Sequence, residues 1–165
     1  MSKTLNEKRL YNIALYYLER FDASAGKLKE VFMRRLYKAK INGDQISPTI
    51  MAEMDRVIEK LKEQGYLNDD RYLENQVRLL QEGGKSVRFI MQKLHTAGLP
   101  ENDVREAIEK ADISDDVQAR KIVQKRKMGF LRGEKQVDFF QKDLAALARM
   151  GFSLDVAKRA LQGDD

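Results

Sequence analysis

Two stretches of the chain repeat one another, and this repeat constrains the fold more strongly than any other feature of the sequence. The segments LHTAGLPENDVREAI and LARMGFSLDVAKRAL superpose without gaps at an offset of 53 residues. A unit of this size is too small to enclose a core of its own, so we expect it to stack on its neighbours. The aligned pairs are Leu94 with Leu147, Gly98 with Gly151, Leu99 with Phe152, Ala107 with Ala160, and Ile108 with Leu161.

Apolar residues recur at intervals of three or four along the whole chain, which predicts helices. No stretch alternates convincingly with a period of two, as a half-buried strand would. The pattern begins with Leu10, Ala14 and Tyr17 and ends with Leu154 and Leu161. It predicts nine helices and no sheet.

Serine, proline and glycine mark the expected helix ends. Serine caps the free N–H groups at the start of a helix, and proline at the first helical position loses no bond. Glycine adopts the left-handed conformation that ends a helix, and the apolar residue after it folds back onto that helix. We therefore expect helix starts at Ser47-Pro48, Ser86, Pro100, Ser114 and Ser153, and helix ends at Gly65-Tyr66, Gly98-Leu99, Gly129-Phe130 and Gly151-Phe152.

The N-terminal third fits the same plan, with a longer second helix and a loop, INGDQIS, before the third. The sequence therefore predicts an all-α protein, built as an elongated, curved array of three tandem three-helix repeats. The repeats are expected over residues 1–66, 67–113 and 114–165. Such an array offers a long surface to its partners rather than a deep pocket to a small-molecule substrate.

The composition limits the setting of the protein. The 165 residues include no cysteine, which excludes disulfides and thiolate zinc sites and favours a reducing compartment. The segment MSKTLNEKRLYNIAL has no long apolar run, so we expect a cytoplasmic protein without a signal peptide or membrane anchor. The net charge of +5 has the sign that suits contact with phosphate. Basic residues outnumber acidic ones before residue 67, by 13 to 9, and after residue 112, by 11 to 8, but not between them.

The stretch LNDDRYLENQV combines several acids with an arginine and a tyrosine, as catalytic sites, metal sites and helix starts all do. Asn68 and Asp69 lie where the fourth helix begins, and a side-chain oxygen there caps a free N–H group. A helix start favours the charged form of an acid, whereas a catalytic acid needs a raised pKa. The spacing also lacks the glycine and the closing acid of a calcium loop. We interpret Asn68–Tyr72 as a helix start, with Arg71 placed to pair with a neighbouring acid.

The remaining candidate motifs also favour structural roles. His95 is the only histidine, which excludes a two-histidine catalytic or metal site, and we expect it partly exposed on a helix. The sequence GGKS at residues 83–86 lacks the earlier glycine and the preceding strand of a phosphate-binding loop, so we expect a glycine hinge and a serine cap. Because no other catalytic or dinucleotide motif occurs, the sequence predicts a protein that is not an enzyme and uses no cofactor or metal.

Two segments concentrate positive charge. Residues 120–135, RKIVQKRKMGFLRGEK, contain a single acid, Glu134, and the second predicted helix carries another basic group. Such runs are usually solvated faces, but they also suit phosphate or an acidic protein surface. Phe130 and Leu131 either stack on a base or pack in the core. The candidate binding residues of the two segments are Arg34, Arg35, Lys38, Lys121, Lys125, Arg126, Lys127, Arg132 and Lys135.

The stretch GYLNDDRYLENQVRLLQEGGKSVRFIMQKLHTAGL resembles the RecX family of bacterial recombinase regulators. The order and spacing of the matching residues carry the resemblance, rather than any single motif. Residues 85–90 lack the family's usual glycine-proline pair and one arginine, and Met91 replaces another basic residue, so this part is less basic than is typical. Arg88 keeps its basic position and joins the candidate binding residues. The matching residues are Gly65, Leu67, Asp69, Arg71, Tyr72, Val77, Gly84, Arg88, Ile90, Leu94, Gly98, Leu99, Val104, Ala107 and Ile108.

The resemblance implies a non-enzymatic regulator of the RecA recombinase that modulates recombination, DNA repair and the SOS response. Members of the family lie in the helical groove of the RecA–single-stranded DNA filament and suppress its ATPase and strand-exchange activity. The implied partners are the RecA filament and the single-stranded DNA within it, and we expect a monomer. The residues alone leave two alternatives: a nucleic-acid-binding helical module without a protein partner, and a protein-interaction scaffold unconnected with DNA.

Overall fold

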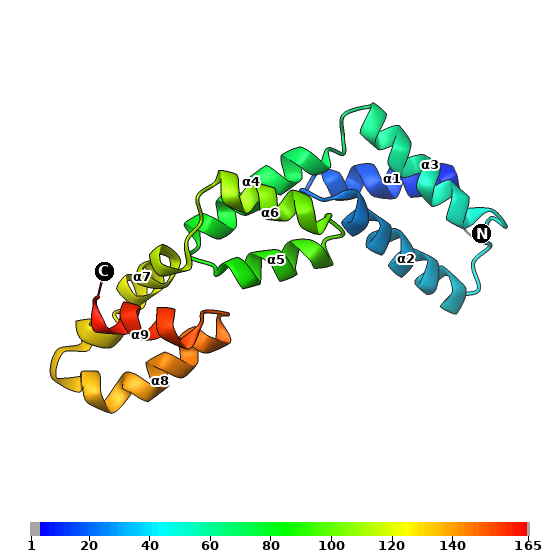
Figure 1. Ribbon diagram of the computed structural model, residues 1–165. Coiled ribbons are helices and arrows are strands. Elements are labelled where there is room, and N and C mark those ends of the chain that lie inside the picture. Colours follow the sequence, from blue (N-terminus) through cyan, green and yellow to red (C-terminus); the bar gives the residue numbers. More distant parts are fainter. Residues whose placement is uncertain (1–3, 165) are drawn as a thin grey trace. The chain divides into compact units, whose positions relative to one another are not determined.

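The computed structural model describes residues 4–164, and every regular element in this range is helical (Figure 1). The predicted all-α class is therefore confirmed, whereas the division into three repeats stays a prediction. The only strand-like pairing in this range is a single bridge between Leu5 and Ile46. None of these helices has the length and apolar character that crossing a membrane requires. The elements are α1 (Glu7–Leu18), α2 (Ala25–Ile41), α3 (Ile50–Glu63), α4 (Asp69–Glu82), α5 (Val87–Thr96), α6 (Glu101–Lys110), α7 (Asp115–Arg126), the 3-10 helix η1 (Gly129–Lys135), α8 (Gln136–Arg149) and α9 (Leu154–Gln162).

The internal contacts divide the chain into two compact units. The N-terminal unit extends to Tyr72 and includes Ala97–Leu99. In it, α1 and α2 both pack on α3, and their apolar faces enclose a common core. Phe32 and Met54 at the centre of this core have no exposed surface, and burying one such side chain contributes about 1.5–3 kcal/mol. Burial of these apolar faces therefore supplies most of the stability of this unit.

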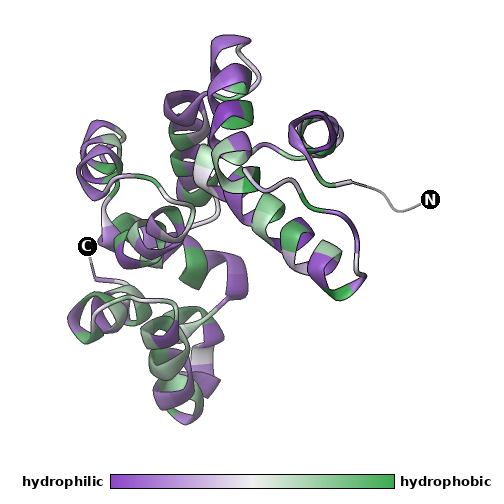
Figure 2. Ribbon diagram, turned by 90° about the vertical axis from the view of Figure 1, so that its right-hand side faces the viewer, coloured by the Kyte–Doolittle hydropathy of each residue, from purple (hydrophilic) through white to green (hydrophobic). Residues whose placement is uncertain are grey.

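The C-terminal unit comprises Leu73–Thr96 and the chain from Pro100 onward. Within it, α5 packs on α6, and both α7 and α8 pack on α9. Leu147 and Leu161 are fully buried in the core that the last three helices share. Apolar and polar residues lie on different sides of individual helices (Figure 2), which is the arrangement that the spacing of apolar residues predicts.

The two aligned segments of the sequence repeat adopt the same local structure. Gly98 and Gly151 both have left-handed φ angles, of 80° and 95°. The apolar residues that follow them, Leu99 and Phe152, are both buried, with 3% and 4% of their surface exposed. In each segment the chain therefore leaves one helix through a glycine and folds the next side chain back into the interior.

Most of the predicted helix starts are confirmed. Asn68, Ser86 and Ser153 each accept a hydrogen bond from the backbone N–H three residues later, at 3.0, 3.2 and 3.3 Å. Pro100 and Ser114 also stand directly before helices, although their side chains form no capping bond. These bonds satisfy N–H groups that have no partner within their own helix.

The predicted start at Ser47-Pro48 is wrong, because α3 begins at Ile50. The Ile50 N–H donates to the Ser47 carbonyl oxygen at 3.1 Å, so Pro48 lies in a turn before the helix. The hydroxyl of Ser47 donates to the carboxylate of Glu53, and Thr49 donates to the same oxygen at 2.9 Å. This buried carboxylate, which the sequence did not single out, holds the turn in place.

Three of the four predicted glycine ends, including Gly65, are confirmed by left-handed φ angles. After Gly65, however, Leu67 is buried and Tyr66 is half exposed, so the side chain that folds back is one residue later than expected. The predicted end at Gly129 is wrong. There, α7 ends at Arg126, and Lys127 adopts the left-handed conformation, with φ 50°.

Gly129 instead permits a close approach to α9. A Cβ atom at this position would lie 2.3 Å from the carbonyl oxygen of Leu161, closer than any side chain allows. The Gly129 N–H donates to the carboxylate of Asp143 on α8. The sequence therefore indicates correctly that position 129 requires a glycine. The reason is the close approach to α9, and not the end of a helix.

Candidate functional site

The predicted basic group of the N-terminal unit lies on the exposed face of α2. Arg34, Arg35 and Lys38 are exposed and form no ion pair within residues 4–164. They point to solvent because α2 buries Phe32 and Leu36 on its other side. Arg35 and Lys38 line a hollow between α1 and α2, whereas Arg34, one turn before Lys38 on α2, lines a shallow groove between α2 and α3.

The predicted basic group of the C-terminal unit lies mainly on α7. Lys121 and Lys125, one turn apart, line an open hollow with Val117 and Arg120. The ammonium of Lys121 donates to the carbonyl oxygen of Gln81 at 3.2 Å, so this residue also caps the end of α4. Lys125 forms no ion pair with any residue that the structure describes.

The neighbouring candidates are also open to solvent. Arg126 and Lys127 at the end of α7 are exposed, as are Arg88 on α5 and Lys135 at the end of η1. Within residues 4–164 none of these four forms an ion pair. Cations in the last turn of a helix stabilise it through the helix dipole, so Arg126 has a structural contribution as well. The four charges remain available to an external anion.

Arg132 differs from the other candidates because its guanidinium is held inside its own unit. It donates two hydrogen bonds to the Asp143 carboxylate, at 2.7 and 2.8 Å, and lies over the ring of Phe139. The hydrogen bond from Arg132 holds the pKa of the Asp143 carboxyl below its usual value. The same pair raises the pKa of Arg132. The sequence missed Asp143 because it lies 11 residues away on another element.

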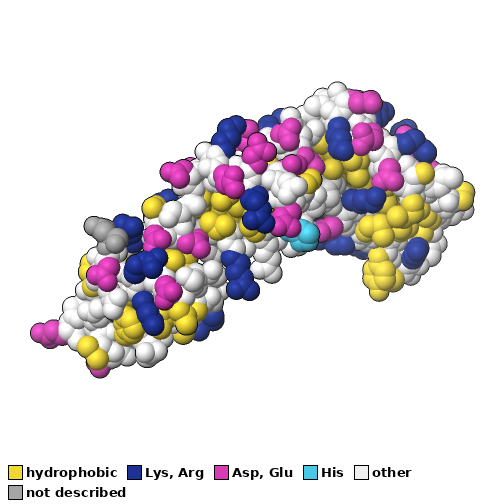
Figure 3. Space-filling view, viewed as in Figure 1, with side chains coloured by type: hydrophobic (Ala, Val, Ile, Leu, Met, Phe, Trp, Pro, Cys, Tyr) yellow, Lys and Arg dark blue, Asp and Glu magenta, His cyan; other side chains and the backbone are white. Residues whose placement is uncertain are grey.

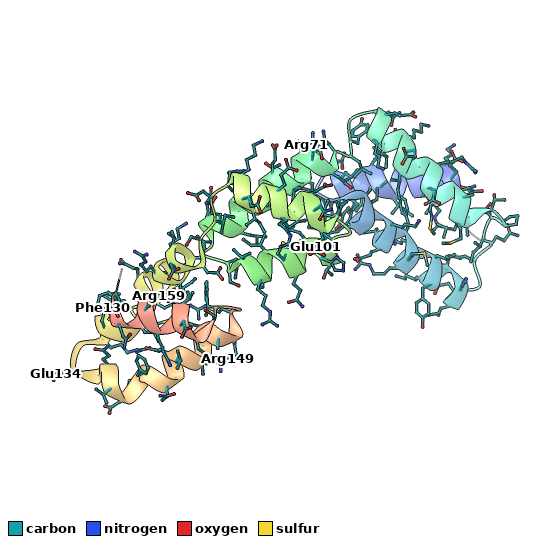
Figure 4. All side chains as sticks on the ribbon, in the orientation of Figure 1. Arg71, Glu101, Phe130, Glu134, Arg149 and Arg159 are labelled. Carbon is teal, nitrogen blue, oxygen red and sulfur yellow. The ribbon has the colours of Figure 1, made fainter. Side chains whose placement is uncertain are left out.

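Phe130, which Figure 4 labels, and Leu131 both lie on η1 and are 39% and 41% exposed. Neither is buried, so of the two roles that the sequence left open, packing in the core is wrong for both. Phe130 does contact the end of α9, where a Cβ atom on Gly163 would lie 3.1 Å from its ring. The rest of its ring remains accessible to solvent.

The stretch Asn68–Tyr72 is a helix start, as predicted, but it also joins two helices. The Asp69 carboxylate accepts a hydrogen bond from the Ala25 N–H at 2.9 Å, so it caps the start of α2. The hydroxyl of Ser24, which is fully buried, donates to the Ala97 carbonyl oxygen at 2.5 Å. We call these contacts the first junction. Asp69 therefore has a structural role, because it caps a helix that begins 44 residues earlier in the chain.

The side chains next to Asp69 do not form a catalytic group. Arg71 is exposed at the start of α4 (Figure 4) and forms no ion pair among the described residues, so its expected pairing with an acid is wrong. Tyr72 is buried, and burial raises the pKa of its hydroxyl above the ordinary value. A phenol with a raised pKa stays protonated near neutral pH and is a poor base.

The same set of contacts occurs a second time, in the C-terminal unit. The Asp115 carboxylate accepts a hydrogen bond from the Val87 N–H at 2.8 Å. The hydroxyl of Ser86 donates to the Met150 carbonyl oxygen, also at 2.8 Å. We call these contacts the second junction. In both junctions a serine caps one helix, and the first acid of a later helix binds the N–H of the residue after that serine.

The buried carboxylates have environments unlike those of catalytic acids. The hydroxyl of Ser47 holds the pKa of Glu53 below its ordinary value, just as Arg132 does for Asp143. A general acid needs the opposite shift, because it must hold its proton near neutral pH. Within residues 4–164 no three acids, histidines or cysteines are placed to hold a metal ion. His95 is exposed on α5, as expected.

Comparison with known proteins gives consistent relatives, although no family model matches the chain. A protein from Myxococcus xanthus (strain DK1622), named "Regulatory protein RecX", is 32% identical over 160 residues, which cover 94% of this chain and 85% of the relative. A protein of the same name from Ectopseudomonas mendocina (strain ymp) is 30% identical over 112 residues, covering 68% of this chain and 73% of the relative. Another, from Agrobacterium fabrum (strain C58 / ATCC 33970), is 30% identical over 155 residues, covering 91% and 80%.

Two solved structures share the fold. A crystal structure of regulatory protein RecX superposes with a TM-score of 0.66 at 19% identity, covering 93% of this chain and 72% of the other. The crystal structure of RecX from Lactobacillus salivarius gives a TM-score of 0.63 at 20% identity, covering 95% of each chain. The sequence identity to the Myxococcus protein over nearly the whole chain establishes the relationship that the motifs predicted: the chain belongs to the RecX family of regulatory proteins.

Proposed function

We propose that the protein binds the filament that RecA forms on single-stranded DNA and lowers its recombinase and ATPase activity. The observation that carries the proposal is family membership, through relatives named as RecX regulatory proteins. The protein is proposed to act as a monomer in the cytoplasm, without cofactor or metal. The filament groove and the single strand inside it are the proposed binding site and the second partner.

The unpaired basic side chains support this proposal. Arg34, Arg35 and Lys38 in one unit, and Lys125 and Arg126 in the other, have no ionic partner among the described residues. Their charges are therefore free for the phosphates of a nucleic acid or the carboxylates of a protein. Such contacts release or displace counterions, so binding should weaken as the salt concentration rises.

The surfaces that carry these charges are shallow, which also fits regulation by contact. The hollows beside Arg35 and Lys125 are open to solvent. Occupying a groove on a polymer needs only complementary shape and charge, and these hollows suit such a contact.

The proposal is tested by the rate of ATP hydrolysis of RecA on circular single-stranded DNA, with increasing amounts of the protein. We expect the rate to fall as the protein approaches the concentration of filament subunits. In the double variant Lys125→Glu and Arg126→Glu, half-inhibition should need about tenfold more protein, since one lost charged contact is worth roughly 1.4 kcal/mol. An unchanged rate at an excess of the native protein would contradict the proposed function.

The matched control is the double variant Lys93→Glu and Lys110→Glu. These lysines also lie exposed in the last turns of helices of the same unit, so the change in charge and in helix-dipole energy is the same. The control should inhibit like the native protein. Equal weakening in both variants would mean that net charge, and not the α7 surface, governs inhibition.

One observation favours a second function, binding to bare nucleic acid. Lys127 and Lys135 are unpaired within the described chain and lie on the segment that carries the exposed ring of Phe130, and a ring beside free cations is a feature of sites that stack bases. If this segment binds bare single strands, affinity for an oligo-dT should fall by orders of magnitude between low and moderate salt. Replacing Phe130 with alanine should then weaken that binding, and no effect would remove this alternative.

A further inference from the structure

The exposed face of α2 carries large apolar side chains that the proposed function does not use. Met33, Tyr37 and Ile41 are 42%, 68% and 67% exposed, and their spacing of four residues places them on one side of the helix. Met51, at the start of α3, is 48% exposed. Figure 3 shows hydrophobic side chains gathered over α2, with basic side chains beside them. We call these four residues the apolar ridge.

The apolar ridge borders a groove between the two helices. Met33 and Met51 line it together with Gly26, Lys29, Glu30 and Arg34, and its volume is about 700 Å³. At its edge the ammonium of Lys29 donates to the Asp55 carboxylate at 2.8 Å, which links α2 to α3. A groove of this size holds several side chains, and a contiguous exposed apolar surface typically marks an interaction site.

The helix α2, which forms one wall of the groove, is strongly positive as a whole. Residues 25–41 contain six basic side chains and one acid, Glu30. Lys29 is committed to Asp55, but Arg34 and Lys38, which follow one flank of the ridge, have no ionic partner among the described residues. The surface therefore combines an apolar floor with unpaired cations on its edge.

We propose that this groove binds an acidic amphipathic helix of a partner protein. Apolar residues of that helix would cover Met33, Tyr37 and Met51, and its carboxylates would pair with Arg34 and Lys38. From Met33 to Ile41 the ridge is about 12 Å long, which matches roughly two turns of a helix laid along it. The inference names a protein ligand for one part of the surface that the proposed function uses, but its test does not require the recombinase.

Nucleic acid is a poorer match for this groove. Single strands bind without sequence preference by stacking successive bases on aromatic rings. The ridge has a single ring, Tyr37, and its other members are aliphatic or thioether side chains. Met33 and Met51 are flexible and adapt to the shape of apolar protein side chains.

A second copy of the chain is also a poor match. Two copies that met through this face would bring two rows of unpaired cations together, and like charges at an interface oppose association. Each copy has only Glu30 on α2 to offset the repulsion. Charge complementarity therefore selects an acidic partner over self-association.

The test uses a fluorescent helical peptide of about 14 residues, four turns long, with leucines on one face and glutamates on the other. Anisotropy should show binding to the full-length protein, and no binding to the same peptide with lysines in place of the glutamates. The double variant Met33→Gln and Tyr37→Gln should weaken binding by at least about tenfold, the loss that corresponds to roughly 1.4 kcal/mol. Both positions are exposed and glutamine is a good helix former, so the fold should be unchanged by circular dichroism.

The matched control is the double variant Leu79→Gln and Val137→Gln, which replaces two exposed apolar residues on α4 and α8. It should bind the acidic peptide as the native protein does. Failure of the native protein to bind the peptide, or equal binding by the Met33 and Tyr37 variant, would overturn the inference. So would loss of oligo-dT binding, or of self-association in sedimentation, in that variant alone. The ATPase assay of the proposed function is independent of all these outcomes.

Discussion

The first and second junctions are built from the same bonds, but they close around different side chains. In both, a serine hydroxyl donates to a carbonyl oxygen beside a left-handed glycine, and an aspartate caps the N–H after the serine. The residue after that N–H is Gly26 in the first junction and Arg88 in the second. The bonds are therefore the constant part of the junction, and the neighbouring side chains set how closely the backbones approach.

The approach is closer in the first junction. A Cβ atom on Gly26 would lie 2.7 Å from the Ala97 carbonyl oxygen and 3.1 Å from the Cα of Gly98. In the second junction Arg88 keeps its side chain, and its Cβ lies 3.6 Å from where a Cβ on Gly151 would stand. A full side chain at Arg88 is thus compatible with the second junction, whereas the first tolerates none.

The junctions also differ at the fourth residue of the helix that begins with the capping aspartate, which is α4 in the first junction and α7 in the second. In the first junction it is Tyr72, whose ring is buried and 3% exposed. In the second it is Gln118, which is 1% exposed and donates from its amide to the carbonyl oxygens of Gln81 and Lys85, both at 3.0 Å. At this position the first junction therefore buries an aromatic ring, and the second buries an amide that donates hydrogen bonds at the end of α4.

The largest effect should come from Gly26→Ala. In an open helix this change stabilises by about 0.5–1 kcal/mol. Here the new Cβ meets a backbone oxygen that cannot rotate away, and we expect the N-terminal unit to lose up to about 3 kcal/mol. Native-state hydrogen exchange, read for peptides of each unit, measures this loss.

The control for this change is Arg88→Ala, the corresponding residue of the second junction. Its side chain is exposed, so the C-terminal unit should change by less than about 0.5 kcal/mol. If Gly26→Ala proved as harmless as Arg88→Ala, the close approach in the first junction would not be a real difference between the two.

The next largest effect should come from Gln118→Ala. The change removes two hydrogen bonds, to the carbonyl oxygens of Gln81 and Lys85, and the packing of a buried side chain, which together cost about 2 kcal/mol. At the corresponding position of the first junction, Tyr72→Phe removes only a hydroxyl and should be nearly neutral. Urea denaturation of each variant measures the two values. Similar losses at both positions would show that hydrogen bonding seals both junctions.

Asp69→Ala and Asp115→Ala should each cause a smaller loss of stability, and the two losses should be equal. Each change removes one carboxylate cap from a backbone N–H, worth about 1 kcal/mol. Hydrogen exchange should show faster opening at the start of α2 in the first variant and of α5 in the second. If one variant lost more than twice as much stability as the other, the two aspartate caps would not be equivalent.

The sequence predicted the helices and many of their ends because those depend on neighbouring residues. It identified Asp69 as the start of a helix for the same reason. It did not find the bond from Asp69 to Ala25, because that partner lies 44 residues away in the sequence and has no local signal. The left-handed turns at Asp112, after α6, and at Lys127, after α7, were missed because residues with side chains rarely adopt the φ angles of 51° and 50° found there. For the binding surface, the sequence located the basic residues but could not separate Arg132, whose charge is engaged by Asp143, from its unpaired neighbours.

The smallest expected effect is a loss of stability at acidic pH. It should differ between the N-terminal unit and the C-terminal unit. The folded-state pKa values of Glu53 in the N-terminal unit and Asp143 in the C-terminal unit lie below their ordinary values of 4.5 and 3.8. Each carboxylate therefore adds stability that is complete above the ordinary pKa and is lost as the pH falls through the lower, folded-state pKa. Stability should be constant from pH 7 down to about 5, and the contribution of Glu53 should start to fall before that of Asp143.

Pepsin cleavage in mild urea between pH 5 and 3, with the sites mapped by mass spectrometry, measures the two units separately. Glu53→Gln should remove part of the acid dependence of the N-terminal unit only, and Asp143→Asn part of that of the C-terminal unit only. Each variant is the control for the other, because both remove one buried carboxylate and keep its shape. If either change altered the acid response of both units together, the two would unfold as one body, and the junctions would have to be treated as parts of a single cooperative structure.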